Sequence, residues 1–76
     1  MAARHGLYAR RILARNVVRL RKMRKMNQEE LADAAQLSQP QISDIENAKT
    51  NIRLDVLQSL ATGLSARLAD LFEEGR

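Results

Sequence analysis

The chain has 76 residues, 45% of them hydrophobic but only 3% aromatic, so it can form one small domain around an aliphatic core. It contains no cysteine, which excludes disulfides and thiolate metal sites. No apolar run approaches the roughly 20 residues of a membrane span, and no long apolar segment follows Met1, so we expect a cytoplasmic protein without a membrane partner.

The formal net charge of +4 is distributed unevenly along the chain. Residues 1–25 contain nine Lys or Arg residues and no acid, whereas residues 26–76 contain four bases and nine acids. Such a basic block suits a polyanion such as DNA. A solvated helix face has the same composition, because a helix with bases all round cannot direct every one at a single ligand. Both interpretations stay open at this point.

Residues 1–6 have the composition of a disordered basic tail that ends at Gly6. The tail holds His5, the only histidine, and one histidine without cysteine makes a poor metal site, so we expect no metal. Residues 7–26 contain neither Gly nor Pro and predict one long first helix. Within it Leu13, Val17 and Leu20, at i, i+4 and i+7, should face the core.

Residues 1–12 are expected to form a basic extension that continues into the first helix, in front of a helical domain at residues 13–76. The apolar residues Tyr8, Ile12 and Met23 lie on faces next to the predicted core face. The extension has three open roles, which are contact with a partner, contact with DNA, or none. An amphipathic membrane-surface helix has a similar pattern, but this segment needs its apolar face for the core.

Residues 27–46 predict two short helices joined by a tight turn. The first begins at Asn27 and places Leu31, Ala32 and Ala35 on one face. Leu37 then breaks the helical phase of the apolar residues.

The second of these helices is predicted to begin at Gln39. Ser38 before it is a preferred N-cap residue, and Pro40 fits its first turn, where a missing N–H costs nothing. Ile42 and Ile45 should face inward, which leaves the polar residues Gln39, Gln41, Ser43 and Asp44 on other faces. Two helices that cross over a short turn in this way predict the helix-turn-helix that enters a major groove.

Two further apolar patterns follow a polar connection at residues 47–51. A fourth helix is predicted from one inner face, made of Leu54, Leu57, Leu60, Ala61 and Leu64. It should end near Gly63 and Ser65. A short fifth helix is predicted from Leu68, Leu71 and Phe72 at i, i+3 and i+4. We therefore expect an all-α chain of five helices without a sheet.

These motifs resemble the Cro/phage-repressor helix-turn-helix family of transcriptional regulators, also called the xenobiotic-response-element type. The resemblance covers roughly residues 13–72 and lies in Asn27-Gln28-x-Glu30-Leu31-Ala32, Leu37-Ser38, Ile42-Ser43-x-Ile45-Glu46-Asn47, Lys49, Leu54, Leu57, Ala61, Leu64, Leu68 and Asp70-Leu71-Phe72. Gln36 and Ala48 depart from the family, which usually has Gly at both turn positions because the backbone there is left-handed.

The resemblance implies a DNA-reading helix whose first, second and sixth residues reach base edges. These are Gln39, Pro40 and Asp44, with Gln41 and Ser43 as secondary candidates. A Gln amide matches the donor and acceptor of adenine, whereas Pro40 can touch only apolar surface such as a thymine methyl. Asp44 either accepts from cytosine, faces solvent, or pairs with a basic residue on another helix.

The resemblance also implies residues that position the protein rather than read sequence. The implied phosphate contacts are Gln28, Asn47, Lys49 and Asn51, and Gln28 is further expected to brace Gln39. Arg21 late in the first helix and Glu46 at the end of the third would form a structural ion pair.

We therefore expect a sequence-specific transcriptional regulator that binds a pseudo-palindromic operator as a homodimer. The dimer interface is expected at the end of the chain, among Leu64, Leu68, Leu71 and Phe72. The size suits a phage-type repressor or a controller protein of a restriction–modification system, which Asn51-Ile52-x-Leu54-Asp55 resembles loosely. The alternative is an antitoxin that also binds DNA. Without a nucleophile–base pair or a phosphate loop, neither an enzyme nor a cofactor is expected.

Overall fold

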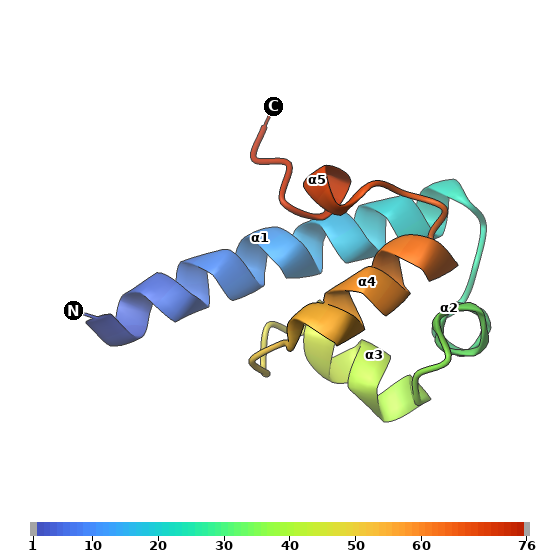
Figure 1. Cartoon of the computed structure of the whole chain (residues 1–76), viewed down its shortest axis with the longest axis horizontal. Coiled ribbons are helices and arrows are strands. Elements are labelled where there is room, and N and C mark those ends of the chain that lie inside the picture. The colour runs from blue at the N-terminus through green and yellow to red at the C-terminus, as the bar shows by residue number, and fades with distance from the viewer. Residues whose placement is uncertain (1, 76) are drawn as a thin grey trace.

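The computed structural model describes residues 2–75, and the side chains of residues 6–75 within them. This part of the chain contains five helices and no strand, which confirms the predicted all-α fold. The helices are α1 (Ala2–Met23), α2 (Gln28–Ala35), α3 (Gln39–Glu46), α4 (Leu54–Gly63) and α5 (Leu68–Leu71). In Figure 1 the long helix α1 crosses the whole molecule, with α2, α3 and α4 gathered below its second half and α5 above it.

The core is aliphatic and takes residues from all five helices. Its buried members are Leu13, Val17, Leu31, Ala32, Ala35, Ile42, Ile45, Leu57, Leu60, Ala61, Leu64 and Leu71. The inward faces predicted for α2 and α3 lie in this core, and Leu20 of α1 packs against it while partly exposed. Burial of these side chains, at roughly 1.5–3 kcal/mol for each Val, Leu or Ile, is the main stabilising term in a domain without disulfides.

The first helix is longer at its start than the sequence predicted. Residues 2–6, expected as a disordered tail, are helical in the structure. Ala and Arg are strong helix formers, and one Gly costs only about 1 kcal/mol relative to Ala, so Gly6 does not end the helix. At the other end α1 stops at Met23, and Lys25 adopts a left-handed φ of 58°. The side chain of His5, predicted to bind no metal, lies outside the described residues.

Leu54 was predicted in the core and is instead 83% exposed. It is the first residue of α4 and precedes the buried Leu57 by one turn. Helical periodicity specifies the face on which a residue lies, but not how far the neighbouring helices extend along that face. Leu54 lies past the point where the neighbouring helices cover this face of α4, so it is exposed.

The predicted dimer interface is also corrected in part. Leu64 and Leu71 are 2% and 0% exposed within a single chain, so they are core residues that a second copy cannot reach. Leu68 and Phe72 are 46% and 42% exposed and remain available. An apolar residue on a short terminal helix fits either a monomer core or an interface, and the sequence pattern alone does not separate these two cases.

Asn16 connects the C-terminal segment to α1 through hydrogen bonds. It is only 1% exposed, and its Nδ2 donates to the carbonyl oxygens of Leu71 at 2.9 Å and Glu73 at 2.8 Å. Arg15 donates to the same Glu73 carbonyl at 3.1 Å. Carbonyls at the end of a helix have no partner within the helix, and Asn16 supplies one for α5. The apolar periodicity of α1 gave no indication of this role.

Gly63 permits a close approach between α2 and α4. A Cβ added at Gly63 would lie 2.9 Å from both Cβ and the backbone nitrogen of Ala35. The left-handed residue after α4 is Ser65, with φ 52°, whereas Gly63 has no positive φ. Gly63 is therefore required by helix packing rather than by the turn.

We expect Gly63→Ala to lower the free energy of unfolding. Overpacking against a fixed backbone costs about 1–3 kcal/mol, and the better helix propensity of Ala returns at most about 1 kcal/mol. Urea unfolding followed by circular dichroism measures the difference. The control is Gly6→Ala, whose added Cβ would have only an ordinary contact 3.8 Å from Arg10 Nη2 and should not destabilise the protein. Equal stability of the two variants would contradict the close approach.

Candidate nucleic-acid interface

Both helices of the helix-turn-helix begin with a capping box. At α2, Asn27 Oδ1 accepts from the Glu30 N–H and Glu30 Oε1 accepts from the Asn27 N–H, each at 2.8 Å. At α3, Ser38 Oγ accepts from the Gln41 N–H at 3.2 Å and Gln41 Oε1 accepts from the Ser38 N–H at 2.8 Å. These reciprocal bonds satisfy backbone donors that the first turn of a helix leaves free. They fix where each helix starts, as the sequence predicted for Ser38.

The outer face of α3 carries the candidate base-reading residues. Gln39, Pro40, Gln41 and Asp44 are exposed, Ser43 is half-buried, and the opposite face is buried through Ile42 and Ile45. Gln41 accepts one hydrogen bond of the cap with its carbonyl oxygen, so its two amide N–H groups and one lone pair of that oxygen remain for a ligand. The backbone carbonyl of Ser43 accepts from Asn47 Nδ2 at 2.8 Å, which holds Asn47 against the end of α3.

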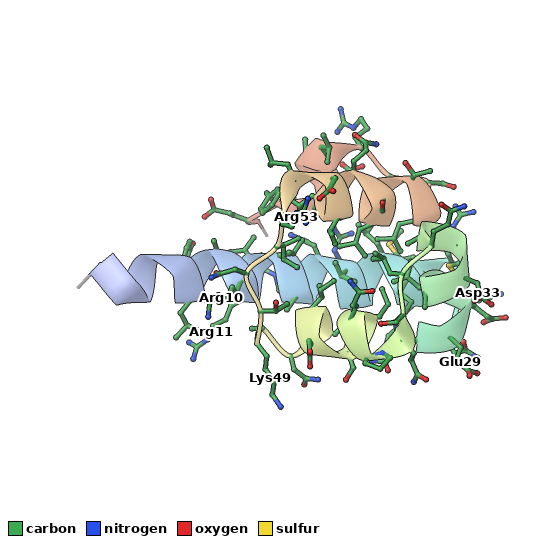
Figure 2. The ribbon with its side chains drawn as sticks, turned by 60° about the horizontal axis from the view of Figure 1, so that its bottom comes forward. Arg10, Arg11, Glu29, Asp33, Lys49 and Arg53 are labelled. Atoms are coloured by element: carbon green, nitrogen blue, oxygen red, sulfur yellow. The ribbon has the colours of Figure 1, made fainter. Side chains whose placement is uncertain are left out.

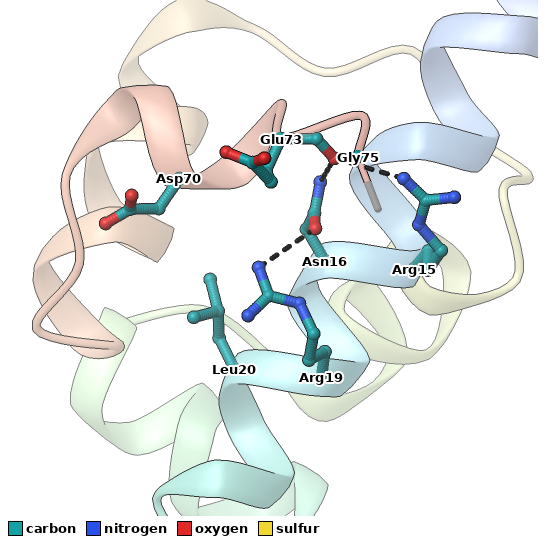
Figure 3. A pocket seen from close by; sticks show the side chains of 7 residues that line it. All are labelled: Arg15, Asn16, Arg19, Leu20, Asp70, Glu73 and Gly75. Atoms are coloured by element: carbon teal, nitrogen blue, oxygen red, sulfur yellow. Dashed lines mark hydrogen bonds between the residues drawn. The ribbon is translucent and has the colours of Figure 1, made fainter.

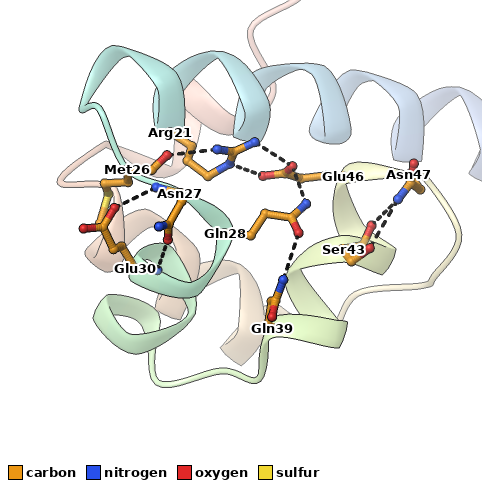
Figure 4. Close-up of polar contacts among 9 residues, drawn as sticks. All are labelled: Arg21, Met26, Asn27, Gln28, Glu30, Gln39, Ser43, Glu46 and Asn47. Carbon is orange, nitrogen blue, oxygen red and sulfur yellow. Dashed lines mark hydrogen bonds and ion pairs between the residues drawn. The ribbon is translucent and has the colours of Figure 1, made fainter.

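A continuous chain of polar contacts runs from α1 to the outer face of α3 (Figure 4). Arg21 Nε donates to Glu46 Oε2 at 2.6 Å and Arg21 Nη2 donates to Glu46 Oε1 at 3.1 Å. Gln28 Nε2 donates to the same Oε1 at 3.0 Å, and Gln28 Oε1 accepts from Gln39 Nε2 at 3.4 Å. The structure thus brings together Arg21 with Glu46, and Gln28 with Gln39.

This chain leaves Gln39 with a defined set of free groups. One N–H of its amide is used by Gln28, so the second N–H and the carbonyl oxygen remain free for a ligand. Gln28 uses both its oxygen and one N–H inside the protein, so it has a single N–H left. The geometry therefore makes Gln28 a brace for Gln39 first, and a phosphate contact only through that one group.

Two turns near this surface adopt the left-handed conformation that glycine favours. Gln36 has φ 58° and Ala48 has φ 57°, at the two positions where the family usually has Gly. A left-handed backbone costs a non-glycine residue roughly 1–2 kcal/mol. Backbone bonds offset this cost, since the Leu37 N–H donates to the Ala32 carbonyl and the Lys49 N–H donates to the Asp44 carbonyl, each at 2.9 Å.

Arg10 is a residue of this surface that the sequence motifs did not indicate. Its Nε and Nη2 donate to Asn51 Oδ1 at 3.1 Å and 2.7 Å, which joins α1 to the loop between α3 and α4. Asn51, expected at a phosphate, therefore has its carbonyl oxygen occupied by Arg10. Lys49 in the same loop is exposed. In Figure 2 Arg10, Arg11 and Lys49 lie toward one end of α3, and Glu29 and Asp33 of α2 lie toward the other.

A second candidate site is a depression of about 470 Å³ between α1 and the C-terminal segment, lined in part by Arg15, Arg19 and Asp70 (Figure 3). Its cations have partners already, because Arg15 is bonded to the Glu73 carbonyl and Arg19 Nη2 donates to Asn16 Oδ1 at 3.1 Å. These contacts hold the chain end in place. The outer face of α3 is therefore the stronger candidate.

Among the side chains of residues 6–75, no three Asp or Glu residues form a group that could hold a metal ion. None of the described helices combines the length and the apolar character needed to cross a membrane.

Comparison with known proteins places this geometry among transcriptional regulators. A family model described as helix-turn-helix matches residues 17–71. The HTH-type transcriptional regulator DdrOP3 of Deinococcus deserti is 43% identical over 54 residues, which are 71% of this chain and 42% of that protein. The matched segment thus spans less than half of this relative.

Solved structures share the fold over most of the chain. The restriction-modification controller protein C.AhdI from Aeromonas hydrophila superposes with a TM-score of 0.80 at 25% identity, covering 83% of this chain and 96% of that one. An HTH_3 family transcriptional regulator from Vibrio cholerae gives a TM-score of 0.85 over 88% of this chain and 38% of its own. At 22% identity the second match shows the fold alone.

We expect Glu46→Ala to lower the free energy of unfolding by about 3–5 kcal/mol, because it leaves the largely buried guanidinium of Arg21 without its counter-ion. It also removes the acceptor of Gln28. Urea unfolding is the measurement. The matched control is Asp55→Ala, which breaks the exposed 3.3 Å pair with Arg53 and should cost less than about 1 kcal/mol. Similar losses in the two variants would contradict a structural role for the Arg21 pair.

Proposed function

The chain belongs to the helix-turn-helix family of transcriptional regulators, whose members bind DNA and are not enzymes. We propose that this protein reads a pseudo-palindromic operator as a homodimer. In this proposal α3 enters the major groove and the loop after it contacts the phosphate backbone. Base edges specify the sequence, whereas phosphate contacts set the register of the protein on the duplex.

The observation that carries the proposal is the braced position of Gln39 on the exposed face of α3. Adenine presents the N7 acceptor and the N6 amino donor in the major groove, and a Gln amide can meet both. Gln39 has one N–H and its carbonyl oxygen free for this purpose, and Gln28 restrains the side chain before DNA arrives. A restrained side chain loses less rotamer entropy on binding than a free one.

The other candidate residues take narrower roles in this proposal. Pro40 presents apolar surface that suits a thymine methyl, and Asp44 suits the amino group of cytosine. Gln41 and Ser43 read bases only through the groups that their contacts leave free. Lys49 and Asn47 contact phosphate from the end of α3.

The proposed dimer forms through the exposed apolar residues of the C-terminal segment, Leu68 and Phe72. A two-fold dimer on DNA places its two recognition helices about 34 Å apart, which is one turn of the double helix. An antitoxin that binds DNA would use the same α3 surface, so co-purification with a second small protein is the observation that separates that alternative from this proposal.

We expect Leu68→Glu to shift the protein from dimer to monomer in sedimentation at micromolar concentration, because it places a charge in the proposed apolar contact. The control is Leu54→Glu, which introduces the same charge at another exposed leucine. If Leu54→Glu yields monomers and Leu68→Glu does not, the interface lies at the start of α4 instead.

Substitutions of Gln39 and Lys49 separate base reading from phosphate binding. Gln39→Ala should cost roughly 1–3 kcal/mol at a site selected from random DNA and relax the preference at one position per half-site. Lys49→Ala should weaken binding to selected and random DNA by similar factors and lower the salt slope by about one unit per half-site. Binding of both variants to both DNAs at several salt concentrations provides the measurement. An equal loss on both DNAs for Gln39→Ala would transfer specificity to other residues of α3 or to DNA shape.

A further inference from the structure

We propose that the N-terminal half of α1 is a second DNA-contacting element, in which Arg11 acts with Lys49 to bind the phosphate backbone beyond the loop end of α3. This inference rests on the proposed function, since it requires α3 to lie on DNA. It adds to the helix-turn-helix a contact surface from a part of the chain that the family match does not cover, because the match begins at residue 17.

The extension is helical and projects beyond the packed helices. Helix α1 has 22 residues, and in Figure 1 its first turns continue past the ends of α3 and α4. At 1.5 Å per residue, residues 2–12 add about 16 Å of helix in that direction. Because the backbone is helical, the positions of Arg10 and Arg11 relative to α3 follow from the course of α1.

Arg10 joins this extension to the loop that carries Lys49. Its two hydrogen bonds to Asn51, at 3.1 Å and 2.7 Å, cross 41 positions of the sequence. The loop is further fixed by the bond from the Lys49 N–H to the Asp44 carbonyl. The extension and the loop are therefore parts of one surface, and Asn51 serves to position Arg10 in it.

Arg11 adds a second cation to that surface, beside Lys49. It is exposed and follows Arg10 by one residue, which turns its side chain about 100° further round the helix. Figure 2 shows Arg11 and Lys49 both directed to the α3 side of α1. Within the described part of the chain, all ion pairs involve other residues, namely Arg21 with Glu46, Arg53 with Asp55 and Arg67 with Asp70.

Charge complementarity identifies the partner as a polyanion. Residues 1–25 contain no acid, so nothing in the extension itself offsets Arg10 and Arg11. Among the acids near α3, Asp44 is exposed on α3 itself, whereas Glu29 and Asp33 of α2 gather toward the end away from the loop in Figure 2, so negative charge is concentrated at the α2 end. A phosphate strand is therefore attracted at the loop end of α3 and repelled at the α2 end. Each phosphate bound by a cation releases condensed counter-ions from the DNA, which is the source of the binding free energy.

The test compares Arg11→Ala with Arg19→Ala. Both remove one positive charge from α1 and keep a strong helix former, but Arg19 faces the C-terminal segment and contacts Asn16. Binding to selected and to random DNA is measured at several salt concentrations. Arg11→Ala should weaken both complexes by similar factors and lower the salt slope by about one unit per half-site. Arg19→Ala should leave the slope unchanged.

The outcomes distinguish this inference from the proposed function. If the unsubstituted protein binds DNA with Gln39-dependent specificity but Arg11→Ala has the salt slope of Arg19→Ala, the inference is overturned and the proposed function stands. If the unsubstituted protein binds no DNA, both fail. If Arg11→Ala changes the oligomeric state in sedimentation and not the salt slope, the extension contacts a second copy of the chain, and the inference is again overturned.

Discussion

The bidentate ion pair between Arg21 and Glu46 is the contact on which the candidate DNA-reading surface depends. It joins the last turn of α1 to the last residue of α3 with the two side chains only 13% and 6% exposed. Loss of either partner leaves a charge that water reaches poorly, so the two helices are strongly held in one arrangement. Glu46 Oε1 also accepts a hydrogen bond from Gln28 Nε2, and Gln28 Oε1 accepts one from Gln39 Nε2. The orientation of an exposed amide thus follows from a largely buried ion pair.

Much of the fold could be predicted because each helix carries its own local signal. The apolar periodicity identified the core faces of α2 and α3, and the capping residues located the start of α3 at Gln39. Depth of burial could not be predicted in the same way. Leu54 lies on the inward-facing side of the pattern and is exposed, whereas Leu71 lies in a similar pattern and is fully buried. Which of two apolar residues is covered depends on where neighbouring helices stop, and this is a property of the whole fold.

In the candidate site, too, local features could be predicted from the sequence and long-range contacts could not. The residues that are near one another in the motif, such as Gln39, Gln41 and Asp44, could be assigned to one helix face from their spacing alone. The contact between Arg10 and Asn51 could not, because it joins residues 41 positions apart and neither belongs to a periodic pattern. The sequence also did not show which side-chain amides are already hydrogen-bonded within the protein. Gln41 completes a cap with its oxygen and Asn51 accepts from Arg10, so part of each amide is already used before any ligand binds.

The basic residues of α1 serve several different roles. Nine bases in the first 25 residues suggest one electrostatic role, but a helix distributes successive side chains around its axis at about 100° intervals. Arg21 therefore meets Glu46 on α3, Arg15 meets the C-terminal segment, and Arg10 meets the loop after α3, whereas Arg19 bonds to Asn16 within α1. Arg11 falls between these directions, is directed to the α3 side in Figure 2, and takes part in none of the ion pairs among the described residues. The same helix can thus stabilise the domain through some of its bases while others remain free for a polyanion.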